Sequence, residues 1–136
     1  MAEAPERVAR CLCGQLKASV KGEPVRVYGC SCFECQRRTG SAFTYTAQFE
    51  ETAVSIEGEF RTFRRLSDKG LTVESNFCPN CGSAVFNRRE SRPGLIGIAV
   101  GAFNDPDFQP PVLIAWGARR HAWFALPDGI ASLDTQ

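Results

Sequence analysis

Short runs of alternating hydrophobic and polar residues, separated by turn residues, repeat along most of the chain. Residues 7–21 alternate around Leu16, Ala18 and Val20 and end in Lys21-Gly22-Glu23-Pro24, which predicts a strand followed by a turn. Residues 25–28 predict a second short strand. A period of two is typical of strands that bury one face, so the pattern indicates a mainly β fold.

β-branched and aromatic runs fill the middle of the chain. They cover residues 42–49, 53–57, 60–66 and 71–77 and are separated by short polar turns. The turn Asp68-Lys69-Gly70 suits a tight hairpin, so residues 60–66 and 71–77 are expected to pair. Runs joined in this way are typical of a meander of antiparallel strands.

One short helix and several later strands complete the predicted elements. Residues 33–38 have helix-compatible side chains, and the helix is expected to stop at Thr39-Gly40. Residues 83–87, 94–103 and 112–116 predict further strands, and residues 121–124 are expected to form the last one. Because no repeat, low-complexity segment or linker is found, residues 1–136 are expected to form a single domain, with a core at about 7–125.

The composition indicates a soluble globular protein. Hydrophobic residues make up 43% of the chain and charged residues 23%, and the net charge is +1. Without a basic tail or a long positive stripe, nucleic acid is not an expected partner. Arginines nevertheless occur in pairs at 37–38, 64–65, 88–89 and 119–120, which leaves local anion pockets open.

The amino-terminal residues contain two acids and no apolar core, so no secretory signal is expected. No apolar run approaches the ~18 residues that a membrane-spanning helix needs, so neither a membrane span nor a membrane partner is expected. The expected compartment is the cytoplasm, where thiols are kept reduced. An odd number of seven cysteines also argues against a disulfide framework, so metal binding or catalysis is the better interpretation.

All seven cysteines belong to three motifs. The motifs are Cys11-Leu12-Cys13, Cys30-Ser31-Cys32-Phe33-Glu34-Cys35 and Cys78-Pro79-Asn80-Cys81. Because side chains alternate along a strand, the two thiols of the first motif are expected to point to the same side as they open the strand at residues 7–21. Zinc takes four ligands in structural sites and three protein ligands in catalytic sites.

Seven cysteines therefore divide into four and three. Cys11, Cys13, Cys78 and Cys81 would form a closed structural zinc site that joins distant parts of the chain. Cys30, Cys32 and Cys35 would remain as a second zinc site with one open position. The alternative is that all seven are structural and unreactive. The lone histidine, His121, could supply a fourth ligand, although a surface or packing role is the favoured interpretation.

Four segments resemble the glutathione-dependent formaldehyde-activating enzyme family, which also includes centromere protein V. They are Cys11-x-Cys13-Gly14, residues 29–43 around Cys30-x-Cys32-x-x-Cys35-Gln36-Arg37-Arg38, residues 77–83 around Cys78-Pro79-Asn80-Cys81, and Gly101-x-x-Asn104-Asp105-Pro106. The resemblance runs from Cys11 to about Trp123. It implies a β-tent of packed antiparallel sheets with little helix and the same division into structural and catalytic zinc ligands. Ser31 stands where many members have histidine, and Asn104 where the family's turn often has aspartate.

The resemblance also implies an activity. This activity is that of a carbon-sulfur lyase, the reversible addition of the glutathione thiol to formaldehyde to give S-hydroxymethylglutathione. The expected partner is therefore a small thiol such as glutathione. Zinc at Cys30, Cys32 and Cys35 would bind the thiolate or polarise the aldehyde. Arg37 and Arg38 are candidates for holding a substrate carboxylate, with a solvated face as the alternative. The sequence predicts no oligomeric state.

Weaker candidates and rival functions complete the predictions. Ser41 and Tyr45 are polar candidates near the same site, and Asp105 is expected to fix its turn. Five aromatic residues are expected in the core: Phe33, Phe43, Phe49, Trp116 and Trp123, with Phe33 and Phe43 also able to wall a pocket. The main rival function is a non-catalytic zinc module for structure or interaction. A redox or metal-storage role is a third possibility.

Overall fold

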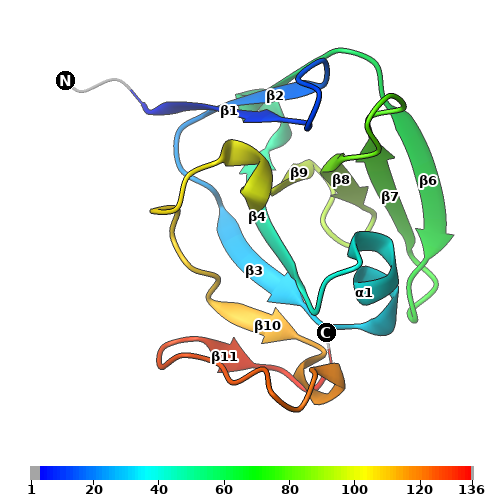
Figure 1. Ribbon diagram of the computed structural model, residues 1–136, viewed down its shortest axis with the longest axis vertical. Helices are drawn as coiled ribbons and strands as arrows, with labels where there is room; N and C mark the ends of the chain where they lie inside the picture. Colours follow the sequence, from blue (N-terminus) through cyan, green and yellow to red (C-terminus); the bar gives the residue numbers. More distant parts are fainter. Residues whose placement is uncertain (1–3, 136) are drawn as a thin grey trace.

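The computed structural model describes residues 4–135, which form two sheets and one α-helix (Figure 1). The smaller sheet has the order β1-β2-β5 and consists of β1 (Glu6–Arg10), β2 (Lys17–Lys21) and β5 (Val54–Glu57). The larger sheet has the order β11-β10-β3-β4-β9-β8-β7-β6. These findings confirm the predicted mainly β fold.

The strands of the larger sheet come from nearly the whole chain. They are β3 (Arg26–Cys30), β4 (Thr44–Glu50), β6 (Arg61–Leu66), β7 (Thr72–Phe77), β8 (Ala84–Arg89), β9 (Leu95–Ala99), β10 (Leu113–Ala115) and β11 (Ala131–Ser132). Figure 1 shows the sheet curving so that β3 and β10 lie on one side of helix α1 (Phe33–Thr39), with β6 and β7 on the other. Three short 3-10 helices, Glu51–Ala53, Val100–Phe103 and Gly117–Arg119, connect strands.

The main core lies between the two sheets. The smaller sheet and its turn contribute fully buried side chains such as Leu16 and Val20, and the larger sheet contributes Phe49, Val85 and Ile98. Each fully buried aliphatic or aromatic side chain stabilises the fold by about 1.5–3 kcal/mol relative to its exposed state. This core holds the β1–β2 hairpin against the centre of the larger sheet.

The predicted hairpin of residues 60–66 and 71–77 is confirmed, because β6 and β7 pair antiparallel from Arg61↔Phe77 to Leu66↔Thr72. The prediction that all the strands of residues 42–77 form one meander is wrong. β4 pairs with β3 and β9, whereas β5 leaves for the smaller sheet and pairs with β2. The 3-10 turn Glu51–Ala53 separates β4 from β5. The alternation of hydrophobic and polar residues specifies which face of a strand is buried but does not specify which strand it pairs with.

Residues 7–21 form two strands rather than one. β1 and β2 pair antiparallel, and Cys11 and Cys13 lie in the turn between them. Gly14 has φ 86° in this turn and donates its N–H to the Cys11 carbonyl at 3.0 Å. The expected same-side arrangement of the two thiols along a strand is therefore wrong, and a turn brings them together instead.

The carboxyl-terminal third also differs from the prediction. The strand expected at 94–103 ends at Ala99, and the 3-10 helix Val100–Phe103 follows, with Asn104 as its C-cap at φ 56°. Residues 121–124 form no strand, and the edge position is taken by β11, which pairs in parallel with β10. β11 has only two residues, which is too short for a periodic pattern to reveal.

Helix α1 begins and ends as the sequence predicts. Cys32 is the N-cap, and its sulfur accepts the N–H of Cys35. Gly40 ends the helix with φ 69°, a left-handed conformation that glycine adopts without strain. No helix within residues 4–135 combines the length and the apolar character needed to cross a bilayer.

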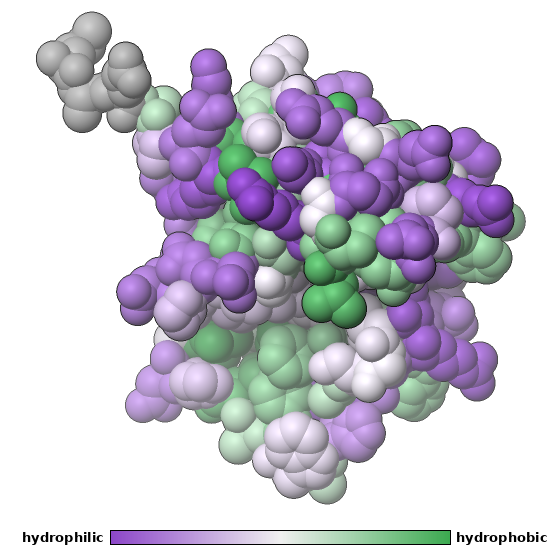
Figure 2. All heavy atoms as spheres, turned by 45° about the horizontal axis from the view of Figure 1, so that its top comes forward, coloured by the Kyte–Doolittle hydropathy of each residue, from purple (hydrophilic) through white to green (hydrophobic). Residues whose placement is uncertain are grey.

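Hydrophobic residues also reach the surface. Figure 2 shows hydrophilic residues covering most of the upper half of one face, while hydrophobic residues gather in its lower half. Of the five aromatic residues expected in the core, Phe49 is fully buried, but Phe33 is 53% exposed and Trp123 is 73% exposed. The core prediction is therefore wrong for these two, which lie in α1 and in the irregular segment after Arg119.

Candidate metal centres and the adjoining cavity

The first cysteine cluster joins two turns that are far apart in the sequence. Cys11 and Cys13 come from the β1–β2 turn, and Cys78 and Cys81 come from the turn after β7. Gly82 has φ 78° and donates its N–H to the Cys78 carbonyl at 2.8 Å, which closes the second turn. The four sulfurs all lie within 4.8 Å of one another.

The spacing of these sulfurs fits zinc. The Cys11 and Cys13 sulfurs are 3.6 Å apart, and the Cys13 and Cys78 sulfurs are 3.7 Å apart. A tetrahedral ion with Zn–S bonds of about 2.3 Å requires sulfur separations of about 3.8 Å. None of the seven cysteines forms a disulfide. Cys11, Cys13, Cys78 and Cys81 can therefore hold a closed four-thiolate zinc.

Hydrogen bonds in this cluster favour the thiolate form. The N–H of Leu16 donates to Cys11 at 3.3 Å, and the side-chain amide of Gln15 donates to Cys78 at 3.0 Å. The Ser83 hydroxyl lies 3.2 Å from the Cys81 sulfur, and this contact, together with backbone hydrogen bonds from Ser83 and Cys13, lowers the pKa of Cys81 to about 5. Donors aimed at sulfur stabilise negative charge, as metal binding also requires.

The second cluster is local. Cys30 is the last residue of β3, Cys32 caps α1, and Cys35 lies in the first turn of the helix. All three side chains are buried, and their sulfurs lie within 4.8 Å of one another. The N–H of Cys32 donates to the Cys30 sulfur at 3.4 Å, and the N–H of Cys35 donates to the Cys32 sulfur at 3.3 Å.

The three thiols share their charge unequally. A hydrogen bond between Cys30 and Cys32 raises the pKa of Cys30 and lowers that of Cys32. The positive charge of Arg65 also lowers the pKa of Cys32. Three buried thiolates repel one another unless a cation compensates them, and a zinc ion would supply that charge. The donor set therefore fits a three-thiolate zinc.

Three hydrogen bonds to backbone carbonyls fix the position of this cluster. The side chain of Gln36 donates to the Ser31 carbonyl at 2.7 Å and to the Arg119 carbonyl at 3.0 Å. The N–H of Ser31 donates to the Ala115 carbonyl at 2.9 Å, which continues the β3–β10 pairing. Ser31 is fully buried, and its hydroxyl oxygen has no hydrogen-bond partner.

A small cavity adjoins the second cluster. Its volume is about 20 Å³, and its lining includes Cys30, Cys35 and the basic residues Arg38, Arg65 and Arg89. A space of this size accommodates a single water-sized group. The amide oxygen of Asn87, another lining residue, is buried without a hydrogen-bond partner.

Strand geometry explains why Arg65 and Arg89 face this cavity. The pairs Arg65↔Val73 and Val73↔Arg89 form one row across β6, β7 and β8. Side chains alternate along a strand, so the preceding residues point to the opposite face. There Arg64 forms a 2.9 Å ion pair with Glu74, while Arg88 forms one of 2.8 Å with Glu51. The pairs at 64–65 and 88–89 therefore each place one charge on the outer face of the sheet and one on the inner face.

The predicted substrate-contacting arginines lie in different surroundings. Both are exposed, but Arg38 lines the small cavity, whereas Arg37 is not among its lining residues. Arg65 and Arg89 were not predicted from the sequence, although two arginine pairs were the signal that could have revealed them: residues 64–65 lie within a predicted strand, and residues 88–89 directly follow one.

The weaker candidates lie outside the thiol clusters. His121 is exposed and belongs to neither cluster. Asp105 fixes its turn as predicted, because its carboxylate accepts the N–H of Asp107 at 2.9 Å. The Tyr45 hydroxyl donates to the carbonyl oxygens of Phe108 and Gln109, and Ser41 is exposed.

Comparisons with known proteins support a family assignment. Two curated relatives, from Aspergillus flavus and Aspergillus oryzae, are each named provisionally as a glutathione-dependent formaldehyde-activating enzyme. Each is 28% identical over 82 residues, which is 59% of this chain and 42% of the relative. The match thus spans less than half of the length of these relatives.

A crystal structure of a Rhodobacter sphaeroides protein has a similar fold. Its TM-score is 0.57 with 20% identity, covering 76% of this chain and 91% of the other. The family model described as glutathione-dependent formaldehyde-activating enzyme matches residues 6–119, which include both cysteine clusters. The chain therefore belongs to the glutathione-dependent formaldehyde-activating enzyme family.

Proposed function

We propose that the protein is a zinc-dependent carbon-sulfur lyase-type enzyme that acts on the adduct of a small thiol and an aldehyde, such as glutathione and formaldehyde. The observation that carries this proposal is the contrast between the two clusters. Four cysteines can close one zinc site, while Cys30, Cys32 and Cys35 provide three ligands beside a cavity. Three protein ligands with an open position are typical of catalytic zinc.

Cys30, Cys32 and Cys35 would hold the catalytic zinc, and Cys11, Cys13, Cys78 and Cys81 the structural one. When bound, the catalytic ion would supply Lewis acidity and an attachment point for a thiolate. The protein's own contribution is a set of positive charges around the open side. Arg38, Arg65 and Arg89 line the cavity, where they would stabilise a thiolate and a developing alkoxide.

The reaction needs no oxidant or reductant. The sulfur of the thiol forms a bond to the aldehyde carbon, the carbonyl π bond breaks, and the proton leaves sulfur and reaches oxygen. The reverse step breaks the carbon-sulfur bond and regenerates both reactants. The chain's task is to orient the two reactants and to favour the thiolate, since positioning alone can lower such a barrier substantially.

Arg38 and Arg37 remain proposed contacts for a substrate carboxylate. Arg38 is the better placed of the two because it lines the cavity beside Cys30 and Cys35. Arg38→Gln is expected to weaken thiol binding, and Arg37→Gln serves as the matched control one residue away. Equal effects of the two substitutions would contradict a specific role for Arg38.

The rival function is a non-catalytic zinc module, and one experiment separates it from the lyase. The number of zinc ions per chain would be measured for wild type and Cys32→Ser. The rate of exchange between formaldehyde and its glutathione adduct would be measured by NMR for both proteins and compared with the uncatalysed rate. Two zinc ions in wild type, one in Cys32→Ser and exchange only in wild type would support the proposal. A single ion in wild type, or exchange no faster than the uncatalysed rate, would contradict it.

A further inference from the structure

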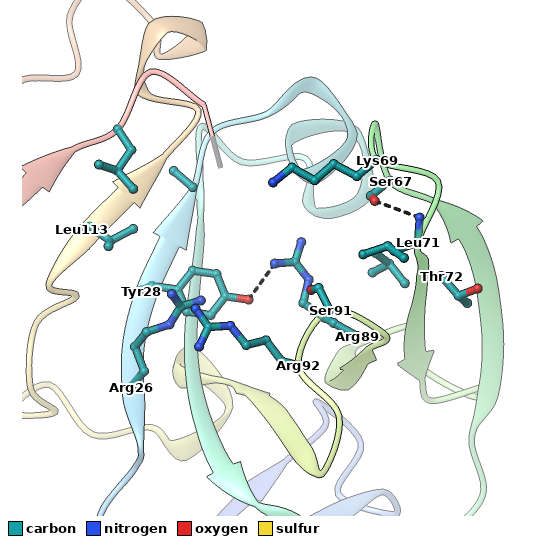
Figure 3. Close-up of a pocket in the computed structure, with 13 residues that line it drawn as sticks. Arg26, Tyr28, Ser67, Lys69, Leu71, Thr72, Arg89, Ser91, Arg92 and Leu113 are labelled. Atoms are coloured by element: carbon teal, nitrogen blue, oxygen red, sulfur yellow. Dashed lines mark hydrogen bonds between the residues drawn. The ribbon is translucent and has the colours of Figure 1, made fainter.

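A second, larger cavity of about 250 Å³ lies next to the small one and is strongly basic. Its lining includes Arg26 and Tyr28 from β3, Lys69 from the β6–β7 turn, Arg89 from β8 and Arg92 from the β8–β9 connection. Figure 3 shows the guanidinium groups of Arg26 and Arg92 beside the Tyr28 ring, with Lys69 reaching in from the opposite side. The lining residues include no aspartate or glutamate.

Three of the positive side chains in this cavity, Arg26, Lys69 and Arg92, are gathered without a carboxylate in the lining. The Nε atom of Arg26 is buried without a hydrogen-bond partner, and its guanidinium lies 4.3 Å from the centre of the Tyr28 ring. Burial and the neighbouring charge of Arg92 lower the pKa of Arg26. The ion pairs found within residues 4–135 involve neither Arg26, Lys69 nor Arg92. Like charges gathered in this way favour an anionic ligand.

The basic cavity is aligned with the three-cysteine cluster. Arg26, Tyr28 and Cys30 occupy alternate positions of β3 and therefore point to the same face. At about 3.3 Å per residue, the Cα atoms of Arg26 and Cys30 are about 13 Å apart. Tyr28, Val73 and Arg89 line both cavities, so the two cavities adjoin along this face.

We propose that the cavity around Arg26, Lys69 and Arg92 binds the carboxylate end of the thiol substrate, while the sulfur of the same molecule reaches Cys30, Cys32 and Cys35. This inference rests on the proposed function. Guanidinium groups match carboxylates in bidentate geometry. A ligand that spans both cavities must be on the order of 10 Å long, which suits an extended tripeptide and exceeds a single amino acid. The cavity therefore selects a carboxylate-bearing thiol of peptide length.

The test measures binding by calorimetry to the zinc-loaded protein with three probes. S-methylglutathione carries the carboxylates but has no free thiol, free cysteine is too short, and cysteamine has a thiol but no carboxylate. Arg92→Gln and Arg26→Gln are expected to raise the Kd of S-methylglutathione about 5-fold and about 10-fold. The Kd values of cysteine and cysteamine are expected to stay unchanged.

Arg61→Gln is the matched control, because Arg61 is an exposed arginine of the same sheet that does not line the cavity. Zinc content and melting temperature of each variant show that the fold is intact. Arg92 is exposed, so its substitution leaves the core unchanged and keeps the test valid if Arg26→Gln misfolds. Unchanged S-methylglutathione binding in Arg92→Gln would overturn the proposal.

Inorganic phosphate distinguishes a substrate site from a site for a free anion. Displacement of phosphate by S-methylglutathione supports the proposal, and failure to displace phosphate bound at the same arginines overturns it. The lyase proposal is judged separately by exchange NMR. If the arginine substitutions weaken S-methylglutathione binding but wild type shows no exchange activity, only the lyase proposal is contradicted. If wild type shows exchange activity but the substitutions leave S-methylglutathione binding unchanged, only the cavity assignment is contradicted.

Discussion

Gln15 and Cys78 lie 63 positions apart in the sequence, yet the Gln15 amide nitrogen donates a 3.0 Å hydrogen bond to the Cys78 sulfur. The same amide donates to the Glu59 carbonyl at 2.8 Å and accepts the Glu59 N–H at 2.9 Å. The backbone of Glu59 therefore fixes the orientation of the amide. Gln15 can stabilise the Cys78 thiolate because its donor is held in place before any metal binds.

Gln15→Ala is expected to weaken zinc binding at the four-cysteine site about 10-fold, because residues that hydrogen-bond to metal ligands typically change metal affinity 10–100-fold. Competition with a chromophoric chelator measures this affinity. Gln109→Ala is the control, since Gln109 is exposed and offers only its backbone carbonyl to Tyr45. Equal zinc affinity in the two variants would show that the Gln15 hydrogen bond has no role.

Loss of zinc from the four-cysteine site is expected to destabilise the fold more than loss from the three-cysteine site. Cys13 and Cys78 are 65 positions apart, whereas the other cluster spans six residues. By loop-closure entropy, a cross-link over ~65 residues contributes about 4 kcal/mol and one over ~6 residues about 2 kcal/mol.

Cys81→Ser and Cys35→Ser provide the comparison, with thermal melting and zinc content measured for both. Cys81→Ser should give the larger drop in melting temperature, and each variant should lose one zinc. A larger drop for Cys35→Ser would mean that the local cluster contributes more to stability than its short loop can explain.

The cysteine spacing predicted the two clusters because ligand chemistry is specified by residue type and count. The geometry of Cys11 and Cys13 could not be predicted in the same way, since an alternating pattern does not distinguish one long strand from two strands and a turn. Arg65 and Arg89 escaped prediction because their role depends on which strands pair, and the hydrophobic pattern does not specify strand partners.

Gly29→Ala is expected to destabilise the protein by about 2–3 kcal/mol. A Cβ atom at this position would lie 2.5 Å from the Ile114 side chain and 2.6 Å from the Thr44 backbone oxygen. The backbone oxygen cannot rotate away, so β3 would shift and displace Cys30, the next residue. Chemical denaturation of the zinc-loaded protein measures the change. Gly101→Ala is the control because a Cβ atom there meets nothing within 4 Å, and equal stability of the two variants would contradict the expectation.

Arg65→Gln is expected to weaken the binding of a small thiol to the zinc-loaded protein about 10-fold, which corresponds to about 1.4 kcal/mol. Arg65 is half-buried on the inner face of β6 and lines the cavity beside Cys30 and Cys35. Its charge there is screened less than that of an exposed arginine. Cysteamine, which carries no carboxylate, is the appropriate probe because it separates this effect from anion binding near Arg26. Arg61→Gln removes an exposed charge from the same strand and should leave the Kd unchanged. If both variants bind cysteamine as wild type does, Arg65 does not stabilise a thiolate in this cavity.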